Sequence, residues 1–375
     1  MLYRKMPGSQ RPLSILGFGC MRLPTVGGLI DEQLTAAMLR YAIDHGVNHV
    51  DTAWSYHDGQ SEPVVGRILR DGYRGKVNLA TKLPAWLVHS RADAEKFLTE
   101  QLKRLQTDHL EYYLVHAIGK DEWERLEREA SIRSFLDDIV ADGRAGAIGF
   151  SSHDLCSGMK QVVDGYDWDF CQIQYNYLDE TYQAGSEGLA YAAAKGLGVV
   201  VMEPLRGGTL TREVPGMRDV CAGAPPRRSA AEWALRWVWN RADVTVVLSG
   251  MSSMAHVEEN VRVAEAGLPC SLSRAELEVY EKLNTLYRSR MKVDCTTCAY
   301  CMPCPSGVSI PECFACYNAA FMFDDRAHAQ LVYGFRARND RGASACNECG
   351  TCEEHCPQRI PIAEKLKEVA AFFGK

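Results

Sequence analysis

Segments that favour strands alternate with segments that favour helices through the first three quarters of the chain. The strand-like segments are short and apolar, and the segments between them carry apolar residues at helical spacing. Parallel strands need a crossover between them, and the helical segments supply it. Eight such units close most naturally into a barrel. An open doubly wound sheet is the alternative, but no G-x-G-x-x-G follows any strand. The sequence therefore predicts an α/β fold with a (β/α)8 TIM barrel. The expected strands are Leu13–Phe18, Val47–Ala53, Val77–Leu83, Leu110–His116, Ala147–Ser151, Phe170–Tyr175, Gly198–Met202 and Val244–Leu248.

The helical segments have recognisable ends. In the first, Asp31 is in position for an N-cap and Gly46 for a C′ glycine. One connection stands out: residues 206–228 are rich in Gly and Pro and form either a lid over the barrel mouth or a surface insertion. The expected helices are Asp31–His45, Glu62–Arg70, Ala92–Leu105, helical material up to Asp142, Leu155–Val163, Glu187–Lys195, Ser229–Asn240 and Met254–Ala264.

The chain is longer than one typical domain. Its 375 residues, 46% of them hydrophobic, suit a large barrel with a smaller appendage. We expect the barrel to span residues 1–272, a connecting helix residues 273–291 and a second domain residues 292–375.

The charge pattern argues against several classes of partner. A net charge of -6 and a pI near 6.0 give no basic footprint, and aromatic and basic residues are not interleaved as in nucleic-acid-binding proteins. The N-terminal residues lack an apolar signal core, and no run reaches the ~18 apolar residues of a membrane helix. We therefore expect a cytoplasmic protein with no nucleic-acid or membrane partner.

Four chemically active side chains fall at three successive strand ends. Asp51 ends the second strand with Tyr56 just beyond it, Lys82 ends the third and His116 the fourth. Each alone has an ordinary interpretation as a turn residue, a surface charge or a structural group. Together they form a proton-transfer set, in which the Lys82 cation lowers the pKa of Tyr56 and the Asp51 carboxylate holds Lys82.

These residues, with VDTAWSY around the first two, resemble the catalytic tetrad of the aldo-keto reductases in order and spacing. The resemblance covers about three quarters of the chain. It implies that Tyr56 is the general acid, that Lys82 tunes its pKa, that Asp51 is the partner of Lys82 and that His116 orients the substrate carbonyl.

The same resemblance implies a nicotinamide site. Ser151 and Ser152 in GFSSH, and Gln172 in CQIQYN, are similar in place to the ligands of the nicotinamide carboxamide, an amide that needs both donors and acceptors. The position of an aromatic residue that stacks on the ring holds Met202, whose thioether can also pack on a ring.

The adenosine half of the cofactor is expected at LSGMSSMAHVEEN. The small residues from Ser249 to Ser253 lead into a helix N-terminus that suits a phosphate, and Glu259 and Asn260 match the adenine-side pair of the family. The cations that bind the 2′-phosphate in NADPH-dependent relatives align with Gly250 and His256. Because a 2′-phosphate calls for Arg or Lys, we predict that NADH is preferred.

Ten of the fifteen cysteines lie between Cys295 and Cys356 in close spacings, which favours metal over disulfides in a chain that we expect to be cytoplasmic. The second run is C-x2-C-x2-C-x3-C-P, the bacterial ferredoxin spacing of a [4Fe–4S] cluster. In two-cluster ferredoxins the fourth cysteine of a run binds the other cluster. One expected set is therefore Cys295, Cys298, Cys301 and Cys356, and the other is Cys346, Cys349, Cys352 and Cys304.

Two alternatives remain open for the cysteines. The first run has two rather than three residues before Cys304, which leaves Cys313 and Cys316 as spare candidates. Pairs of C-x2-C also build zinc ribbons, although two runs that end in Cys-Pro favour iron and sulfur. The segments before and between the runs look helical at Arg274–Met291, Glu312–Ala320 and Asp325–Tyr333. The whole chain thus resembles the aldo-keto reductases that carry a small, mostly helical, C-terminal ferredoxin-like domain.

The expected function is hydride transfer between NAD(P)H and a small carbonyl or alcohol substrate, with two [4Fe–4S] clusters for electron transfer. A hydride carries two electrons whereas each cluster accepts one, and a flavin normally mediates that exchange. One alternative is therefore an electron-transfer enzyme with a flavin, bound or lent by a redox partner protein, although no flavin motif is visible. Another is a nucleotide-binding redox sensor with structural clusters.

Overall fold

The computed structural model describes residues 1–224, 227–337 and 341–374, and the chain divides into two compact units. The barrel unit contains Met1–Thr211 and Ser229–Leu272, and the C-terminal unit contains Arg212–Arg228 and Ser273–Lys375. The predicted boundary at residue 272 stays a prediction. Residues 212–228, which we expected in the barrel domain, group with the C-terminal unit.

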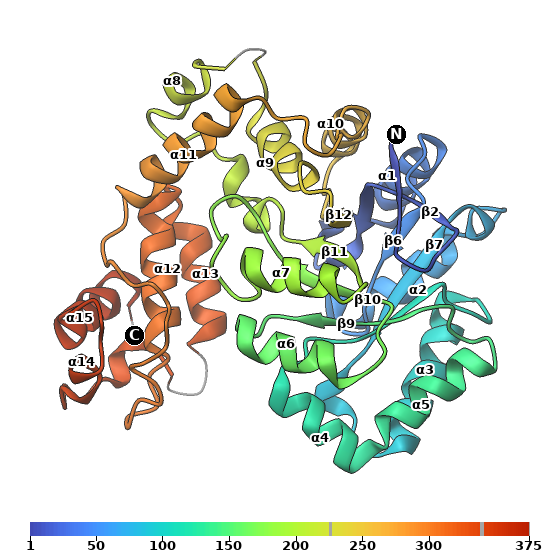
Figure 1. The fold of residues 1–375 in the computed structure, drawn as a ribbon, viewed down its shortest axis with the longest axis horizontal. Helices are drawn as coiled ribbons and strands as arrows, with labels where there is room; N and C mark the ends of the chain where they lie inside the picture. The colour runs from blue at the N-terminus through green and yellow to red at the C-terminus, as the bar shows by residue number, and fades with distance from the viewer. Residues whose placement is uncertain (225–226, 338–340, 375) are drawn as a thin grey trace. The chain divides into compact units, whose positions relative to one another are not determined.

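Eight parallel strands form a closed barrel, and Figure 1 shows them gathered inside a layer of helices. The last strand pairs with the first, with Leu248 opposite Gly17, so the sheet has no free edge. The predicted (β/α)8 barrel is confirmed. In spatial order the strands are β3 (Leu16–Gly19), β6 (His49–Asp51), β7 (Asn78–Leu83), β8 (Tyr112–Val115), β9 (Ile148–Ser152), β10 (Phe170–Gln174), β11 (Gly198–Met202) and β12 (Val244–Ser249).

Helices connect successive strands of the barrel. The predicted first helix is confirmed as α1 (Glu32–Asp44), where the Asp31 side chain accepts a hydrogen bond from the Leu34 N–H at 3.0 Å. Gly46 has a φ of 96°, as its C′ position requires. The other helices of the barrel unit are α2 (Ser61–Ile68), α3 (Arg91–Leu105), α4 (Lys120–Ala130), α5 (Ile132–Ala141), α6 (Cys156–Gly165), α7 (Gly185–Ala194), α9 (Ala230–Trp239) and α10 (Met254–Ala264).

The opening strand differs from the prediction. Instead of one strand over Leu13–Phe18, the chain makes β2 (Pro12–Ser14), which pairs antiparallel with β1 (Tyr3–Lys5), and then enters the barrel as β3. The Asn48 side chain accepts a hydrogen bond from the Ser14 N–H at 2.7 Å and so fixes the break. A second small hairpin, β4 (Thr25–Val26) with β5 (Leu29–Ile30), follows the 3-10 helix η1 (Cys20–Arg22).

The Gly- and Pro-rich segment after the seventh barrel strand is divided between the two units. Its first part, η5 (Arg206–Thr211), packs against α9 in the barrel unit. Its second part carries α8 (Met217–Cys221), which packs against α11 (Arg274–Arg288) of the C-terminal unit. The segment is therefore not one insertion of the barrel. Pro225 and Pro226 lie outside the described residues.

The C-terminal unit is helical in all the elements that the structure describes beyond residue 272. Its core contains Phe314 and Val369, both fully buried, and the rings of Tyr333 and Phe373 stack with centroids 4.3 Å apart. The connecting helix α11 ends three residues before the expected Met291, and α15 was absent from the expected helices. After α11 the elements are α12 (Ile310–Met322), α13 (Arg326–Arg336), η6 (Ala343–Ala345), α14 (Thr351–Glu354) and α15 (Ile362–Phe373).

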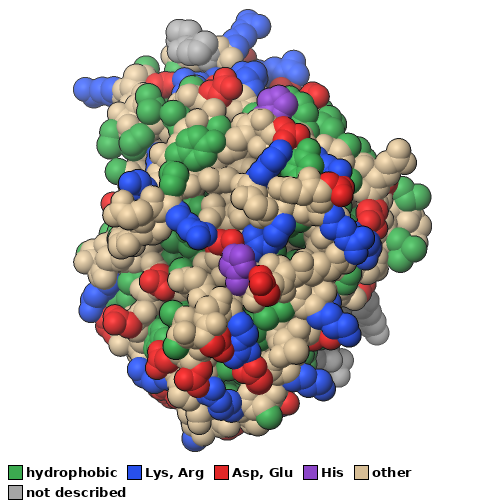
Figure 2. All heavy atoms as spheres, turned by 90° about the vertical axis from the view of Figure 1, so that its right-hand side faces the viewer, with side chains coloured by type: hydrophobic (Ala, Val, Ile, Leu, Met, Phe, Trp, Pro, Cys, Tyr) green, Lys and Arg blue, Asp and Glu red, His purple; other side chains and the backbone are tan. Residues whose placement is uncertain are grey.

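Figure 2 shows acidic and basic side chains interspersed over one face of the molecule. Among the described residues, no helix combines the length and the apolar character needed to cross a membrane.

The interior of the barrel contains one buried histidine that the proton-transfer set does not use. His49 is 1% exposed, lies edge-on to Tyr112 with ring centroids 5.4 Å apart, and has an Nδ1 without a hydrogen-bond partner among the described residues. Burial, with a further contribution from the Lys82 cation, lowers the pKa of His49 to about 4. The native barrel therefore holds His49 in its neutral form.

We predict that His49 makes the barrel less stable in acid. The unfolded chain takes up a proton near pH 6.5 and the folded chain does not until about pH 4, so this contribution to stability is lost as the pH falls through that window. The wild type should lose about 2 kcal/mol more than His49→Gln between pH 7.5 and pH 5. Urea unfolding followed by tryptophan fluorescence measures this, because all seven tryptophans lie in the barrel unit. An equal loss in both proteins would contradict the prediction.

Candidate active site

The structure brings Asp51, Tyr56 and Lys82 together at the carboxyl ends of β6 and β7. The Lys82 Nζ donates hydrogen bonds to Asp51 Oδ1 at 2.7 Å, to the Thr52 carbonyl oxygen at 2.7 Å and to Tyr56 Oη at 3.2 Å. Lys82 is fully buried and Asp51 is 2% exposed. Three acceptors thus compensate the buried ammonium group, and one of its protons points at the Tyr56 hydroxyl.

The Lys82 cation lowers the pKa of Tyr56, as the sequence-based expectation has it. Burial raises the pKa of Tyr56 by more, so the pKa lies above its usual value. Burial also opposes the charge on Lys82, but Asp51 and Tyr56 outweigh it and the pKa of Lys82 is raised. The phenol therefore stays protonated at neutral pH, as a proton donor must.

A strained turn carries Tyr56. It begins the 3-10 helix η2 (Tyr56–Gly59), in which His57 and Asp58 have φ values of 51° and 52°. Two consecutive left-handed residues without a glycine are costly and persist only where the surroundings hold them. Here the His57 Nε2 accepts a hydrogen bond from the Leu23 N–H at 3.1 Å, which ties this turn to the loop after β3. The sequence analysis missed His57, since no local pattern distinguishes it from a solvated loop residue.

A network of buried polar groups fixes the backbone at Lys82 from the side of α2 and α3. The Gln101 side chain of α3 donates to the Lys82 carbonyl oxygen at 2.9 Å and to Glu62 Oε1 of α2 at 2.7 Å. Glu62 also accepts from the Thr81 hydroxyl at 2.7 Å, and Tyr113 donates to the Gln101 amide oxygen at 2.9 Å. This network fixes the end of β7 from two neighbouring helices.

His116 faces the same space from the loop after β8. Its backbone N–H donates to the Leu83 carbonyl oxygen at 3.0 Å, and its ring lies 6.0 Å from the Tyr56 ring and 5.3 Å from the Trp86 ring, between centroids. Burial, then the charges of Lys82 and His153, lower the pKa of His116 well below its usual value. A neutral imidazole therefore stands beside the Tyr56 hydroxyl. Trp86 is 43% exposed, and no sequence motif pointed to it.

The residues expected to hold the nicotinamide carboxamide lie at neighbouring strand ends. Ser151 and Ser152 end β9, Gln172 lies in β10, and all three are 2% exposed. Ser151 Oγ accepts the Ala117 N–H at 2.8 Å, and the Gln172 amide contacts the Met202 sulfur at 3.6 Å. The structure thus groups these residues, with Met202 at the end of β11.

The residues expected on the adenosine side surround the end of β12. Asn260 donates to Ser249 Oγ at 2.8 Å in a buried pair, and Ser253 caps α10 by accepting the His256 N–H at 3.4 Å. Gly250 is exposed at the strand end, and Glu259 is partly exposed on α10. As predicted from the sequence, a capped helix N-terminus follows the small residues.

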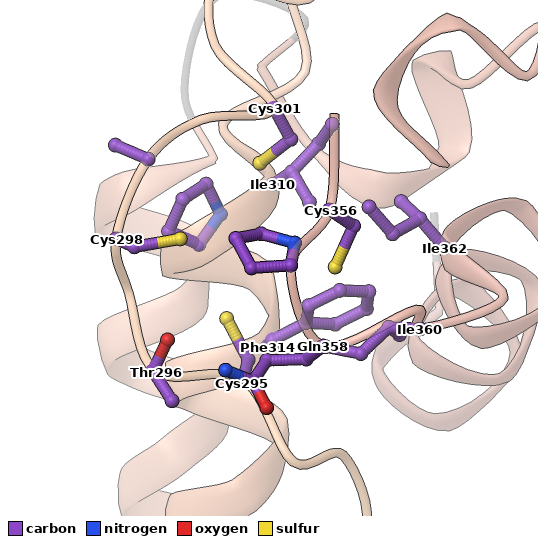
Figure 3. A pocket seen from close by; sticks show the side chains of 13 residues that line it. Cys295, Thr296, Cys298, Cys301, Ile310, Phe314, Cys356, Gln358, Ile360 and Ile362 are labelled. Atoms are coloured by element: carbon purple, nitrogen blue, oxygen red, sulfur yellow. The ribbon is translucent and has the colours of Figure 1, made fainter. Parts of the chain in front are cut away.

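The first set of predicted cysteines lines one pocket in the C-terminal unit. Figure 3 shows Cys295, Cys298, Cys301 and Cys356 around this pocket with their sulfur atoms turned toward it. Apolar side chains such as Phe314 and Ile310 form much of the remaining wall. Within the described residues, no three Cys, His, Asp or Glu side chains converge on one point that could hold a metal ion.

The two cysteine runs share one backbone conformation. In the first run Thr297 and Ala299 have φ values of 58° and 63°, and at the matching positions of the second run Glu348 and Gly350 have φ values of 61° and 77°. Each run also turns a backbone N–H onto its first sulfur. The Glu348 N–H lies 3.4 Å from the Cys346 Sγ, and the Thr297 N–H bonds the Cys295 thiol. Alternating left-handed residues of this kind form nests of N–H groups around anionic centres, including iron–sulfur sites.

In the second set, burial raises the pKa of Cys352 to about 11, and the Cys346 and Cys304 thiols add to the rise, so these three lie near one another. Cys349 is exposed. The spare candidates Cys313 and Cys316 are instead buried in α12 as part of the helical core, with exposures of 2% and 3%.

The chain thus combines a closed eight-stranded barrel with a Lys–Tyr–Asp set and a histidine at the strand ends. The model of the Aldo/keto reductase family matches residues 15–272, and the chain belongs to that family. The matched residues end just before α11, so the larger part of the C-terminal unit, Ser273–Lys375, lies outside the family match, whereas its residues 212–228 lie within it.

Several known proteins are similar to the chain. Methylglyoxal reductase YeaE of Escherichia coli is 28% identical over 74% of this chain and 96% of that protein, and the NADH-specific methylglyoxal reductase of Escherichia coli is 24% identical over 72% and 94%. Among solved structures, the holo form of aldo-keto reductase AKR11C1 from Bacillus halodurans superposes with a TM-score of 0.64 at 26% identity, over 75% of this chain and 96% of that one. An aldo-keto reductase from Klebsiella pneumoniae in complex with NADPH gives a TM-score of 0.61 at 26% identity, over 76% and 96%.

We predict that Asp51 and Lys82 are strongly coupled in stability. Asp51→Asn should lower the free energy of unfolding of the barrel by about 3–5 kcal/mol, because it leaves the buried Lys82 ammonium without its counter-charge. Adding Lys82→Met to Asp51→Asn should restore part of that loss. Urea unfolding followed by tryptophan fluorescence gives the free energies of the wild type, of Asp51→Asn, of Lys82→Met and of the double variant. Losses that simply add in the double variant would show that the pair is not coupled.

Proposed function

We propose that the barrel reduces a small carbonyl substrate with hydride from a nicotinamide cofactor and a proton from Tyr56. The observation that carries the proposal is the Lys82 ammonium group, which bridges Asp51 at 2.7 Å and Tyr56 at 3.2 Å in a fully buried setting. No such arrangement is needed for stability, because a buried ion pair is often no more stable than apolar residues of the same size. A catalytic role explains why this buried ion pair lies at the strand ends of the barrel.

Each member of the set has a distinct role in this proposal. Tyr56 donates its proton to the substrate oxygen as negative charge develops there. Lys82 stabilises the phenolate that remains, and Asp51 keeps Lys82 charged and oriented. His116, held neutral by burial, hydrogen-bonds the carbonyl oxygen and aligns it with Tyr56.

The nicotinamide supplies the hydride when it is bound. Ser151, Ser152 and Gln172 would hold its carboxamide and Met202 would pack on its ring, while the residues from Ser249 to Asn260 would hold the adenosine half. Support comes from the buried, closely grouped hydroxyl and amide groups at the ends of β9, β10 and β12. We propose NADH as the preferred form, because Gly250 and His256 offer no Arg or Lys to a 2′-phosphate.

The names of two relatives suggest a substrate class. Both Escherichia coli relatives are methylglyoxal reductases by name, so we propose a small oxoaldehyde as the substrate class. Methylglyoxal is therefore the first substrate to test.

We predict that Tyr56→Phe removes catalysis and spares cofactor binding. Loss of the proton donor should lower kcat with NADH and methylglyoxal by about 10²- to 10⁴-fold, while the Kd for NADH stays within about twofold. Rates are read from NADH absorbance and binding from tryptophan fluorescence. The matched control is Tyr73→Phe, which removes a tyrosine hydroxyl bonded to Asp44 on the surface and should leave the rate unchanged. A Tyr56→Phe rate close to that of the wild type would overturn the role given to Tyr56.

The C-terminal unit is proposed to hold two [4Fe–4S] clusters, one on Cys295, Cys298, Cys301 and Cys356 and one on Cys346, Cys349, Cys352 and Cys304. The clusters would carry one electron each. In such a cluster every iron takes a single thiolate, so four sulfurs spread around a pocket suit it, whereas zinc needs its ligands to converge within ~2.3 Å of one ion. The four-sulfur pocket and the shared backbone nest of the two runs support the clusters. A redox partner protein would exchange these electrons with the clusters.

We predict that anaerobically purified protein contains roughly eight iron atoms and eight sulfides per chain. Cys356→Ser and Cys352→Ser should each lower the iron content toward one cluster, because each removes a ligand of a different set. Cys270→Ser, which removes an exposed cysteine of the barrel unit, is the control and should leave the iron content unchanged. Metal analysis and the electron paramagnetic resonance of the reduced protein provide the readout. Bound zinc in place of iron would refute the clusters.

A further inference from the structure

Arg22 lies in an unusual position at the mouth of the barrel. It ends η1 directly after β3, and its aliphatic chain passes over the backbone of Gly250. A Cβ built on Gly250 would lie 3.3 Å from both Cβ and Cδ of Arg22. The guanidinium end reaches the loop after β11, where a Cβ built on Gly207 would lie 3.0 Å from the Arg22 Nη2. Arg22 therefore spans from the end of β3 past the end of β12 to the loop after β11.

This cation is not engaged elsewhere. Arg22 is exposed, and no hydrogen bond or ion pair involves it in the part of the chain that the structure describes. The neighbouring cations at the same strand ends do have partners: Arg206 bonds Asp179 at 2.9 Å and Lys82 bonds Asp51 at 2.7 Å. An anionic group that enters between β11 and β12 would therefore find in Arg22 a cation that has no other partner among the described residues.

The course of the cofactor leads to that place. In the proposed function the nicotinamide lies near Gln172 and Met202, at the ends of β10 and β11, and the adenosine half lies near Ser253 and Asn260 beyond β12. The barrel order is β10, β11, β12 and β3, so whatever joins the two halves must pass the ends of β11 and β12. In a nicotinamide dinucleotide the joining group is a diphosphate with two negative charges.

We propose that Arg22 binds the diphosphate of the nicotinamide cofactor. The proposal rests on the proposed function, because it needs the cofactor in that orientation. A guanidinium suits the group, since its N–H donors match phosphate oxygens in pairs. Gly250 has a defined part in the arrangement, because the absence of a side chain there lets the Arg22 chain lie flat across the strand end.

The proposal has a consequence for specificity. The diphosphate is common to NADH and NADPH, so Arg22 contributes to the binding of both and does not distinguish them. Arg22 supplies a cation from the β3 side. On the β12 side, Gly250 and His256 supply no Arg or Lys.

The test is the Kd of NADH and of NADPH for the full-length protein, measured by quenching of tryptophan fluorescence at low and at high salt. Arg22→Gln should raise both Kd values about tenfold or more, by a similar factor, and should flatten their salt dependence. Arg22→Lys should fall between the wild type and Arg22→Gln. Arg128→Gln removes a cation that is 68% exposed on α4 and is the charge-matched control, which should leave both Kd values unchanged.

A double variant tests the geometry. Gly250→Ala adds a Cβ against the Arg22 chain, so it should weaken NADH binding in the wild type and have a much smaller effect in Arg22→Gln. Equal effects of Gly250→Ala in both backgrounds, or an Arg22→Gln protein that binds NADH as tightly as the wild type, would overturn the proposal for Arg22. A wild type that binds neither dinucleotide would instead refute the proposed function, and this inference with it.

Discussion

The active site depends on a charge that the barrel keeps out of water. Lys82 has no exposed surface, and removing an ammonium group from water costs several kcal/mol even after the protein relaxes around it. The cost is met by Asp51, by the Thr52 carbonyl oxygen and by Tyr56, which all come from β6 and the turn after it, whereas Lys82 comes from β7. The pairing of these two strands, with Asp51 opposite Ala80, sets the distances, and the network of Glu62, Thr81 and Gln101 fixes β7 from behind. The placement of Lys82 beside Asp51 therefore follows from strand register more than from the loops.

This explains which parts of the site the sequence could predict. Asp51, Lys82 and His116 stand at the ends of apolar runs, and the closure of a parallel barrel brings such ends together whatever the loops do. His57 and Trp86 escaped prediction because their places depend on two loops. One has two left-handed residues with no glycine to announce them, and the other is a short 3-10 turn after β7. The Lys82 cation lowers the pKa of Tyr56 as predicted, but the sequence does not show how deeply Tyr56 is buried, and burial raises that pKa by more.

The boundaries of the fold show the same limit. The run from Leu13 to Phe18 is mostly apolar, so periodicity could not locate the break that Asn48 makes by bonding the Ser14 N–H across 34 residues. Residues 212–228 follow a barrel strand in sequence yet pack with α11, because α8 finds its apolar partner there. The cysteine runs behaved in the opposite way. Their spacing, with the ferredoxin rule that the fourth cysteine of a run binds the other cluster, selected Cys295, Cys298, Cys301 and Cys356, and these four line one pocket.

Arg22 shows why matching positions is a weak guide to charge. The positions that match the family's 2′-phosphate cations lie after β12 and hold Gly250 and His256, so they draw no attention to a cation for the diphosphate. In the barrel, however, β3 and β12 are neighbours, with Phe18 opposite Ser249, so a side chain from the loop after β3 can occupy the space that a long side chain at position 250 would fill. A glycine on one strand and an arginine on the next then form a single functional unit. The closeness of these two residues cannot be seen in the sequence, where they lie more than two hundred positions apart. It is a direct consequence of closing the sheet.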